Sequence, residues 1–130
     1  MTDQYQGPGF GTEDTFVPDN LFAGDFPVVS ENVTIEEGQD LTRGAVLGKV
    51  TYSGECKLSL SAASDGSQTP FAILAVDVDA TAAAVVAPAH LSGIFNERAL
   101  TIGTGHTAAS IRDGLRALSI FLKSTVAAGV

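Results

Sequence analysis

The sequence lacks lysine and arginine over its first forty residues, and Arg43 is the first cation of the chain. That stretch holds nine Asp or Glu residues, whereas residues 41–130 hold six acids and seven bases. The net charge of −8 therefore arises in the opening stretch. An acidic chain repels phosphates instead of replacing their counterions, so we expect no nucleic-acid partner.

Residues suited to a metal or a disulfide are also few. Cys56 is the only cysteine, so it cannot form an internal disulfide, and we expect it to be a buried small hydrophobe. His90 and His106 lack the spacing of a metal motif. Asp77 and Asp79 could bind a cation, but a hard cation needs about six oxygen ligands, and we favour a solvated turn. No cofactor or metal is expected.

Long apolar runs are missing as well. The longest uncharged stretch, residues 80–96, contains Pro88, His90 and Gly93 and falls short of a membrane span. The N-terminus has no cationic segment followed by an apolar one, so no secretory signal is expected. We therefore expect no membrane partner, and a soluble protein that is synthesised in the cytoplasm.

Residues 1–35 are predicted to form an acidic, flexible N-terminal arm. Residues 7–11 read Gly-Pro-Gly-Phe-Gly, which cannot hold a helix because Gly and Pro disfavour it. The low hydrophobicity and high charge favour a solvated tail. However, four Phe residues lie within the first 26 positions, and these favour an arm that becomes ordered on a partner. Composition leaves both interpretations open.

Residues 36–130 are predicted to form a mainly β module. Residues 45–52 and 57–61 read as a hairpin, and the glycines of the first strand indicate a bulge or a close backbone approach. The continuous apolar run 71–76 predicts a buried central strand. Further strands are expected at 81–87, which Pro88 would end, and at 91–95.

One segment near the C-terminus has helical periodicity. Ala108, Ile111, Leu115 and Leu118 follow the spacing of an amphipathic helix. Ser110 or, three residues earlier, Thr107 could cap its start. The helix is expected to end near Leu118, where the chain could return as a short strand. One short helix among many short strands predicts a mainly β fold.

No catalytic motif stands out. The sequence has no Gly-x-Ser-x-Gly elbow and no plausible Cys–His pair. The loop that contains His106 lacks the lysine and spacing of a phosphate-binding loop. We therefore predict a protein that is not an enzyme.

Residues 41–123 resemble the lambda-type bacteriophage head decoration proteins. The resemblance rests on short segments that occur in the family's order and spacing. They are Lys57-Leu58, Asp65-Gly66, Ile73-Leu74-Ala75-Val76 followed by Asp79, Ser92-Gly93-Ile94-Phe95 and Ala117-Leu118-Ser119-Ile120.

The resemblance implies a small β-clip-like barrel or sheet module and a homotrimer. Such trimers bind the lattice of the major capsid protein on the outer surface of the expanded phage head, and they brace the shell against the pressure of the internal DNA. The resemblance also implies that the arm docks on the capsid. The arm residues expected to contact it are Phe16, Phe22, Phe26, Val28, Val29, Val33 and Ile35.

Two other functions are considered. Trimeric dUTPases share the β-clip, so a nucleotide hydrolase that uses Asp79 is one alternative. A carbohydrate-binding or adhesion module on the virion surface is another. Only Phe71, Phe95 and Phe121 are aromatic after residue 70, which argues against a stacking platform for sugars.

Overall fold

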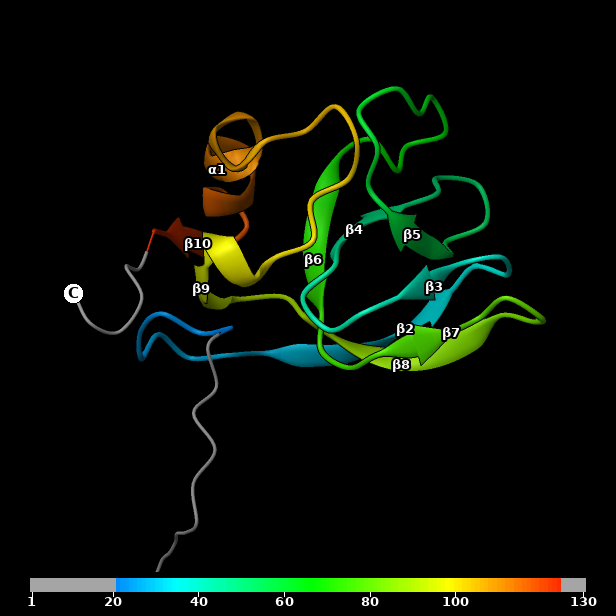
Figure 1. Ribbon diagram of the computed structural model, residues 1–130, viewed down its shortest axis with the longest axis horizontal. Helices are drawn as coiled ribbons and strands as arrows, with labels where there is room; N and C mark the ends of the chain where they lie inside the picture. Colours follow the sequence, from blue (N-terminus) through cyan, green and yellow to red (C-terminus); the bar gives the residue numbers. More distant parts are fainter. Residues whose placement is uncertain (1–20, 125–130) are drawn as a thin grey trace, which may run out of the picture.

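The computed structural model describes residues 21–124, which fold into a mainly β structure with one α-helix, as predicted (Figure 1). Phe16 of the predicted arm lies outside the described residues. The elements are β2 (Ser30–Ile35), β3 (Asp40–Leu41), β4 (Val46–Lys49), β5 (Cys56–Leu58), β6 (Pro70–Leu74), β7 (Val78–Asp79), β8 (Val85–His90), β9 (Gly93–Asn96), the 3-10 helix η1 (Glu97–Ala99), α1 (Ala108–Arg116) and β10 (Ile120–Lys123).

Five strands close into a small barrel in the order β2-β5-β4-β6-β8. β8 pairs with β2 in antiparallel register from Ser30 opposite His90 to Ile35 opposite Val85. The barrel closes where Ile35 of β2 meets Cys56 of β5 in parallel. β4 and β5 form the predicted hairpin. The short strands β3 and β7 form a separate antiparallel pair.

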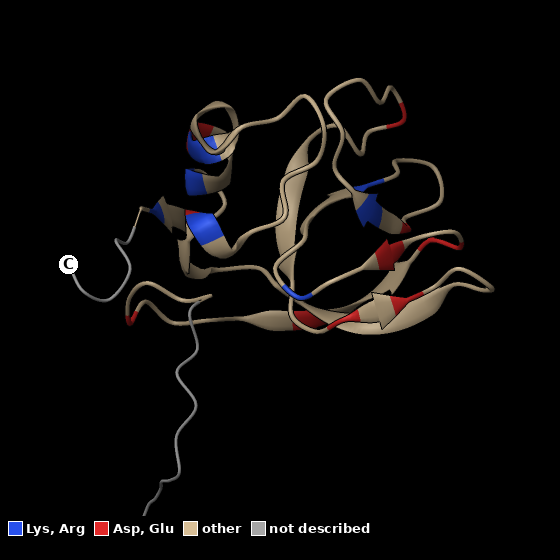
Figure 2. Cartoon of the chain, in the orientation of Figure 1, with Lys and Arg blue, Asp and Glu red and all other residues tan. Residues whose placement is uncertain are grey.

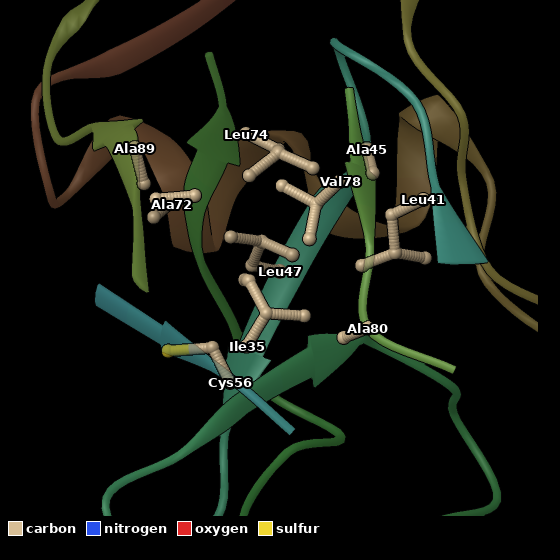
Figure 3. Packing of buried hydrophobic residues seen from close by; sticks show 11 residues of the cluster. Ile35, Leu41, Ala45, Leu47, Cys56, Ala72, Leu74, Val78, Ala80 and Ala89 are labelled. Carbon is tan, nitrogen blue, oxygen red and sulfur yellow. The ribbon is translucent and has the colours of Figure 1, made fainter. Parts of the chain in front are cut away.

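The barrel encloses one hydrophobic core. Figure 3 shows side chains from several strands pointing toward one another, with Ile35, Leu47 and Leu74 near the centre. Cys56 is fully buried at the edge of this cluster, as expected. Burial raises the pKa of the Cys56 thiol, so the side chain acts as a small hydrophobe.

A second core lies between the barrel and a layer made of α1, β9 and β10. β9 and β10 pair in parallel, with Ile120 opposite Gly93. Ile111 and Leu115 of α1 pack with Ile120 in this layer, and Val46 and Ile73 reach it from the barrel strands. β4 and β6 therefore form a wall with a core on each side. This explains why the apolar run in β6 is continuous. The predicted burial is confirmed for residues 72–74, whereas the strand ends at Leu74 and Val76 is exposed.

The start of α1 is fixed by a capping box. Thr107 is the N-cap: the Ser110 backbone N–H donates to Thr107 Oγ1 at 3.1 Å, and the Thr107 N–H donates to Ser110 Oγ at 2.9 Å. Of the two predicted caps, Thr107 is therefore the N-cap, and Ser110 is not the cap but the third residue of the helix, which completes the capping box. After Arg116 the chain turns through Ser119, whose φ is +70°, and enters β10, close to the predicted break.

Pro88 does not end a strand, contrary to the sequence-based expectation. It lies inside β8, opposite Asn32 of β2. Its carbonyl accepts a hydrogen bond from Ala75 N–H at 3.0 Å. A residue's N–H and C=O point to the same side of a strand, so the missing N–H faces the position where β6 has already ended at Leu74. The pairing of β8 with β2 continues through Pro88, so proline is tolerated at this position beside the end of β6.

Gly48 marks a close approach of two backbones. The β4–β6 register shifts between Leu47 and Gly48, and a Cβ at Gly48 would lie 1.8 Å from the carbonyl oxygen of Ser67. The loop that holds Ser67 is fixed by Asp65, whose Oδ1 accepts from Ser67 Oγ at 2.6 Å and from Ser67 N–H at 3.0 Å. The predicted bulge and close approach are both confirmed.

Candidate functional site

The root of the arm is anchored beside β9. Asn96 N–H donates to the Leu21 carbonyl at 2.7 Å, and Ala23 N–H donates to the Ile94 carbonyl at 2.8 Å. Residues 21–23 therefore run along the edge of β9 opposite β10. The Leu21 side chain is fully buried in the second core, so the point at which the arm leaves the module is fixed.

Residues 27–29 are held by Ser92, which precedes β9. Ser92 Oγ donates to the Pro27 carbonyl at 2.9 Å and accepts from Val29 N–H at 2.9 Å. Leu91 N–H donates to the Val29 carbonyl at 2.7 Å. These bonds fix the backbone of the segment, while the side chains of Val28 and Val29 stay exposed.

Three side chains of this segment form an exposed apolar ridge, which consists of Phe26, Val28 and Val29. Their exposed fractions are 38%, 42% and 54%. The Phe26 ring also contacts Phe121 of β10, with ring centroids 5.1 Å apart. The apolar ridge thus combines a fixed backbone with apolar side chains that face solvent, a pattern typical of a docking surface.

The other predicted contact residues lie deeper. Phe22 is half-buried, with its ring 5.1 Å from that of Phe95. Val33 is half-buried against the barrel core. Ile35 is 0% exposed, so in this structure its side chain is not available to a partner. The role of Phe22 and Val33 at a capsid stays a prediction.

The predicted boundary of the arm at residue 35 coincides with the end of β2. Residues 30–35 form a barrel strand and pair with β8 along their whole length. Removing them would take away the strand that joins β8 to β5 and would open the barrel, so deletion of the arm up to residue 35 is expected to damage the module. The β-branched residues Val33 and Ile35 signal a strand correctly, but its partner is in the module.

Charge is unevenly distributed over the described residues. Figure 2 shows cations gathered on α1, η1 and β10, and acids around β2, β3 and β7. The cations of the first group are Arg98, Arg112, Arg116 and Lys123. Asp40 and Asp79 even lie opposite each other in the β3–β7 pair. Two like charges in directly opposite positions destabilise a strand pair.

A cleft of about 310 Å³ opens beside β10, among these cations. It is lined by Ile94, Arg112, Arg116, Phe121, Leu122 and Lys123. Arg112 pairs with Glu97, and Arg116 pairs with Asp113 at 2.8 Å. Within residues 21–124 no carboxylate pairs with Lys123. Sequence reasoning missed this basic cleft because its residues come from three separate elements.

His106 and Ser59 lie close together, but their geometry does not suit catalysis. His106 Nε2 is 3.2 Å from Ser59 Oγ and 3.1 Å from the Gln68 carbonyl oxygen. Ser59 Oγ donates its own proton to the Ser67 carbonyl at 2.7 Å. Nε2 therefore faces two acceptors and acts as the donor, so it cannot accept a proton from a serine nucleophile. Ser59 is also fully buried.

The remaining candidate side chains have local roles. Asp77 Oδ1 accepts from Arg43 N–H at 2.8 Å. Asp79 Oδ1 accepts from Thr81 Oγ1 at 2.7 Å, and this bond, together with that from Thr81 N–H, lowers the pKa of Asp79. His90 Nδ1 lies 2.8 Å from Ser30 Oγ. Among residues 21–124, no three His, Cys, Asp or Glu side chains are grouped so as to hold a metal ion.

The only α-helix of residues 21–124 has nine residues, and no helix there has the length and apolarity to cross a membrane.

Comparison with known families gives a match over most of the chain. A family model described as bacteriophage lambda head decoration protein D matches residues 11–121. A comparison with curated protein sequences found no match. The matched region includes the root of the arm, every strand of the barrel and helix α1. The chain therefore belongs to the family of bacteriophage lambda head decoration protein D, and it is a phage head decoration protein.

Proposed function

We propose that the protein binds the outer surface of the expanded phage head as a homotrimer and stabilises the shell against the pressure of the internal DNA. The family match over residues 11–121 is the observation that carries this proposal. The match includes residues 11–35 of the arm together with the folded module, which supports one function for both parts.

The apolar ridge is the part of the described surface that fits this role best. Burial of a Val or Phe side chain contributes about 1.5–3 kcal/mol when it goes from fully exposed to fully buried. Phe26, Val28 and Val29 are partly exposed, so each contributes a part of that amount. A trimer presents three ridges and three arms, and once one is bound the others bind as if intramolecularly.

The acids of the arm supply the electrostatic part of the interaction. Residues 1–20 carry four acids and no Lys or Arg. A basic surface on the major capsid protein would attract them over several ångströms and would fix the orientation of docking. Salt screens such attraction, so the affinity for shells is expected to fall as the salt concentration rises.

Co-sedimentation with expanded and unexpanded shells of the cognate phage tests the proposal. The full chain should sediment with expanded shells and much less with unexpanded ones. The double variant Val28→Ser/Val29→Ser should bind expanded shells at least about tenfold more weakly, since a loss of 1.4 kcal/mol already gives that factor. Val86→Ser is the matched control, because Val86 is 64% exposed on β8, away from the apolar ridge. Absence of binding to either shell would refute the proposal.

Light scattering tests the oligomeric state. The free protein should have the mass of a trimer, or it should be a monomer that becomes trimeric on the shell. A dimer in solution that remains a dimer on the shell would contradict the homotrimer.

A further inference from the structure

The arm root is longer than the part of the module that it runs along. Phe22 lies opposite Phe95 in an antiparallel bridge, and Ser30 lies opposite His90 in the β2–β8 pair. Eight steps along the arm root therefore correspond to five steps along the module. The three extra residues make the chain loop out between the two pairings, close to β9 (Figure 1). The apolar ridge lies on this loop.

The loop is held at both ends by backbone hydrogen bonds. At its start, Ala23 N–H donates to the Ile94 carbonyl at 2.8 Å, and at its end, Leu91 N–H donates to the Val29 carbonyl at 2.7 Å. After Leu91 the module chain turns away into β9, and Gly93 in this turn has a φ of +140°. The backbone pairing of this end therefore does not extend beyond Val29 into the loop.

A single hydroxyl group continues the contact where the backbone pairing ends. Ser92 Oγ donates to the Pro27 carbonyl and accepts from Val29 N–H, both at 2.9 Å. It thus bonds the residues on both sides of Val28. Ser92 is only 8% exposed, whereas Val28 is 42% exposed. Ser92 therefore offers almost no contact area of its own, and any effect that it has on a partner acts through the apolar ridge.

Without this hydroxyl, the second half of the loop would sample more conformations. Pro27 and Val29 are exposed, so water can replace the two lost hydrogen bonds and the module should stay folded. A surface that becomes ordered only on binding has a lower affinity, because the cost of ordering opposes binding. The apparent affinity falls in proportion to the fraction of molecules in the binding-competent conformation.

We propose that Ser92 is a positioning residue for capsid binding, which presents the apolar ridge in a preformed conformation without contacting the capsid itself. The inference rests on the proposed function, because it concerns the same docking surface. It separates the residue that orders the apolar ridge from the residues that bury area on the capsid.

Amide hydrogen exchange, followed by NMR, tests the role of Ser92 in the free protein. In Ser92→Ala the Val29 amide should exchange at least about tenfold faster, while the Ala23 amide at the other end of the loop should keep its protection. Ser92→Thr retains a γ-hydroxyl and should keep the Val29 amide protected. Ser67→Ala is the matched control, because Ser67 is a buried serine before β6 whose Oγ donates to Asp65 at 2.6 Å. It should leave Val29 exchange unchanged.

Co-sedimentation of the same variants with expanded shells tests the effect on binding. Ser92→Ala should bind about tenfold more weakly than the unaltered protein, whereas Ser92→Thr and Ser67→Ala should bind as it does. Added to Val28→Ser/Val29→Ser, Ser92→Ala should cause little further loss, because the effects of residues that act through one another are not additive.

Any of four results would overturn the proposal. They are unchanged Val29 exchange in Ser92→Ala, unchanged shell binding by Ser92→Ala, a loss of binding in Ser67→Ala as large as in Ser92→Ala, and a full additional loss when Ser92→Ala is added to Val28→Ser/Val29→Ser. Failure of the unaltered chain to bind any shell would refute the proposed function, and the positioning role would fall with it. The two failures are distinguishable, because only the second is seen in the unaltered chain.

Discussion

The barrel half and the helix half of this molecule differ in charge but are joined by the second hydrophobic core. Residues 21–89 hold nine acids and three bases, whereas residues 90–124 hold two acids and four bases. Yet Val46 and Ile73, from barrel strands, pack in the core under α1. The two halves are therefore packed together in one core, yet they present surfaces of opposite charge.

The largest effect is expected from deletions that separate the arm from the barrel. Removal of residues 1–35 takes away β2 and Ile35, so the barrel should not close, and thermal unfolding should show no cooperative transition. Removal of residues 1–20 leaves every described element in place, and a cooperative transition should remain. Calorimetry on the two truncated proteins measures this. A cooperative transition after removal of residues 1–35 would show that β2 is dispensable.

The next prediction concerns the shared wall. Leu47→Ala in the barrel core and Leu115→Ala under α1 each truncate a fully buried side chain. Each should lower the free energy of unfolding by about 2–5 kcal/mol. Because β4 and β6 serve both cores, each variant should unfold in one transition when followed by denaturant titration. Two separate transitions in Leu115→Ala would mean that the helix layer unfolds independently.

Two glycines should respond in opposite directions to the same change. Gly48→Ala places a Cβ against the Ser67 carbonyl, and such overpacking costs about 1–3 kcal/mol or more. A Cβ at Gly114 in α1 would meet no atom within 4 Å, so Gly114→Ala should stabilise the protein by about 0.5–1 kcal/mol. Denaturant unfolding of both variants gives the comparison. Similar effects at the two positions would contradict the close approach at Gly48.

Much of the fold could be predicted because its signals are local. The apolar run in β6 has no polar face because both faces are buried, and the Thr107–Ser110 cap is fixed by residues three apart. The parallel pairing of β9 with β10 had no such signal, because it joins residues separated by the whole of α1. For the same reason the pairing of β2 with β8 was missed, and β2 was assigned to the arm.

The candidate site was predicted only in part. The apolar contact residues of the arm were expected from the family resemblance, but the backbone of Val29 is held by Ser92, which lies 63 residues away. The basic cleft depends on three elements that the fold brings together. Nothing in the local sequence around Arg116 or Lys123 indicates that they share a cleft.

The smallest effect is expected from Asp65 in the barrel half. Hydrogen bonds from the Ser67 side chain and backbone lower the pKa of Asp65 from 3.8 to about 2. A carboxyl group whose pKa is lower in the folded state stabilises the fold above its unfolded pKa, and this contribution is lost as the pH falls. At neutral pH the unaltered protein should therefore have a higher Tm than Asp65→Asn. This difference in Tm should shrink as the pH falls from about 4 to about 2. Asp113→Asn, at an 85% exposed position of α1, should show a smaller effect.

The most direct test of the docking surface is a cryo-electron microscopy reconstruction of expanded shells decorated with the full chain. We predict that the apolar ridge of Phe26, Val28 and Val29 faces the major capsid protein in each copy of a trimer, and that the chain before Leu21 continues onto the shell. A reconstruction in which the apolar ridge faces solvent while another surface contacts the capsid would contradict the account.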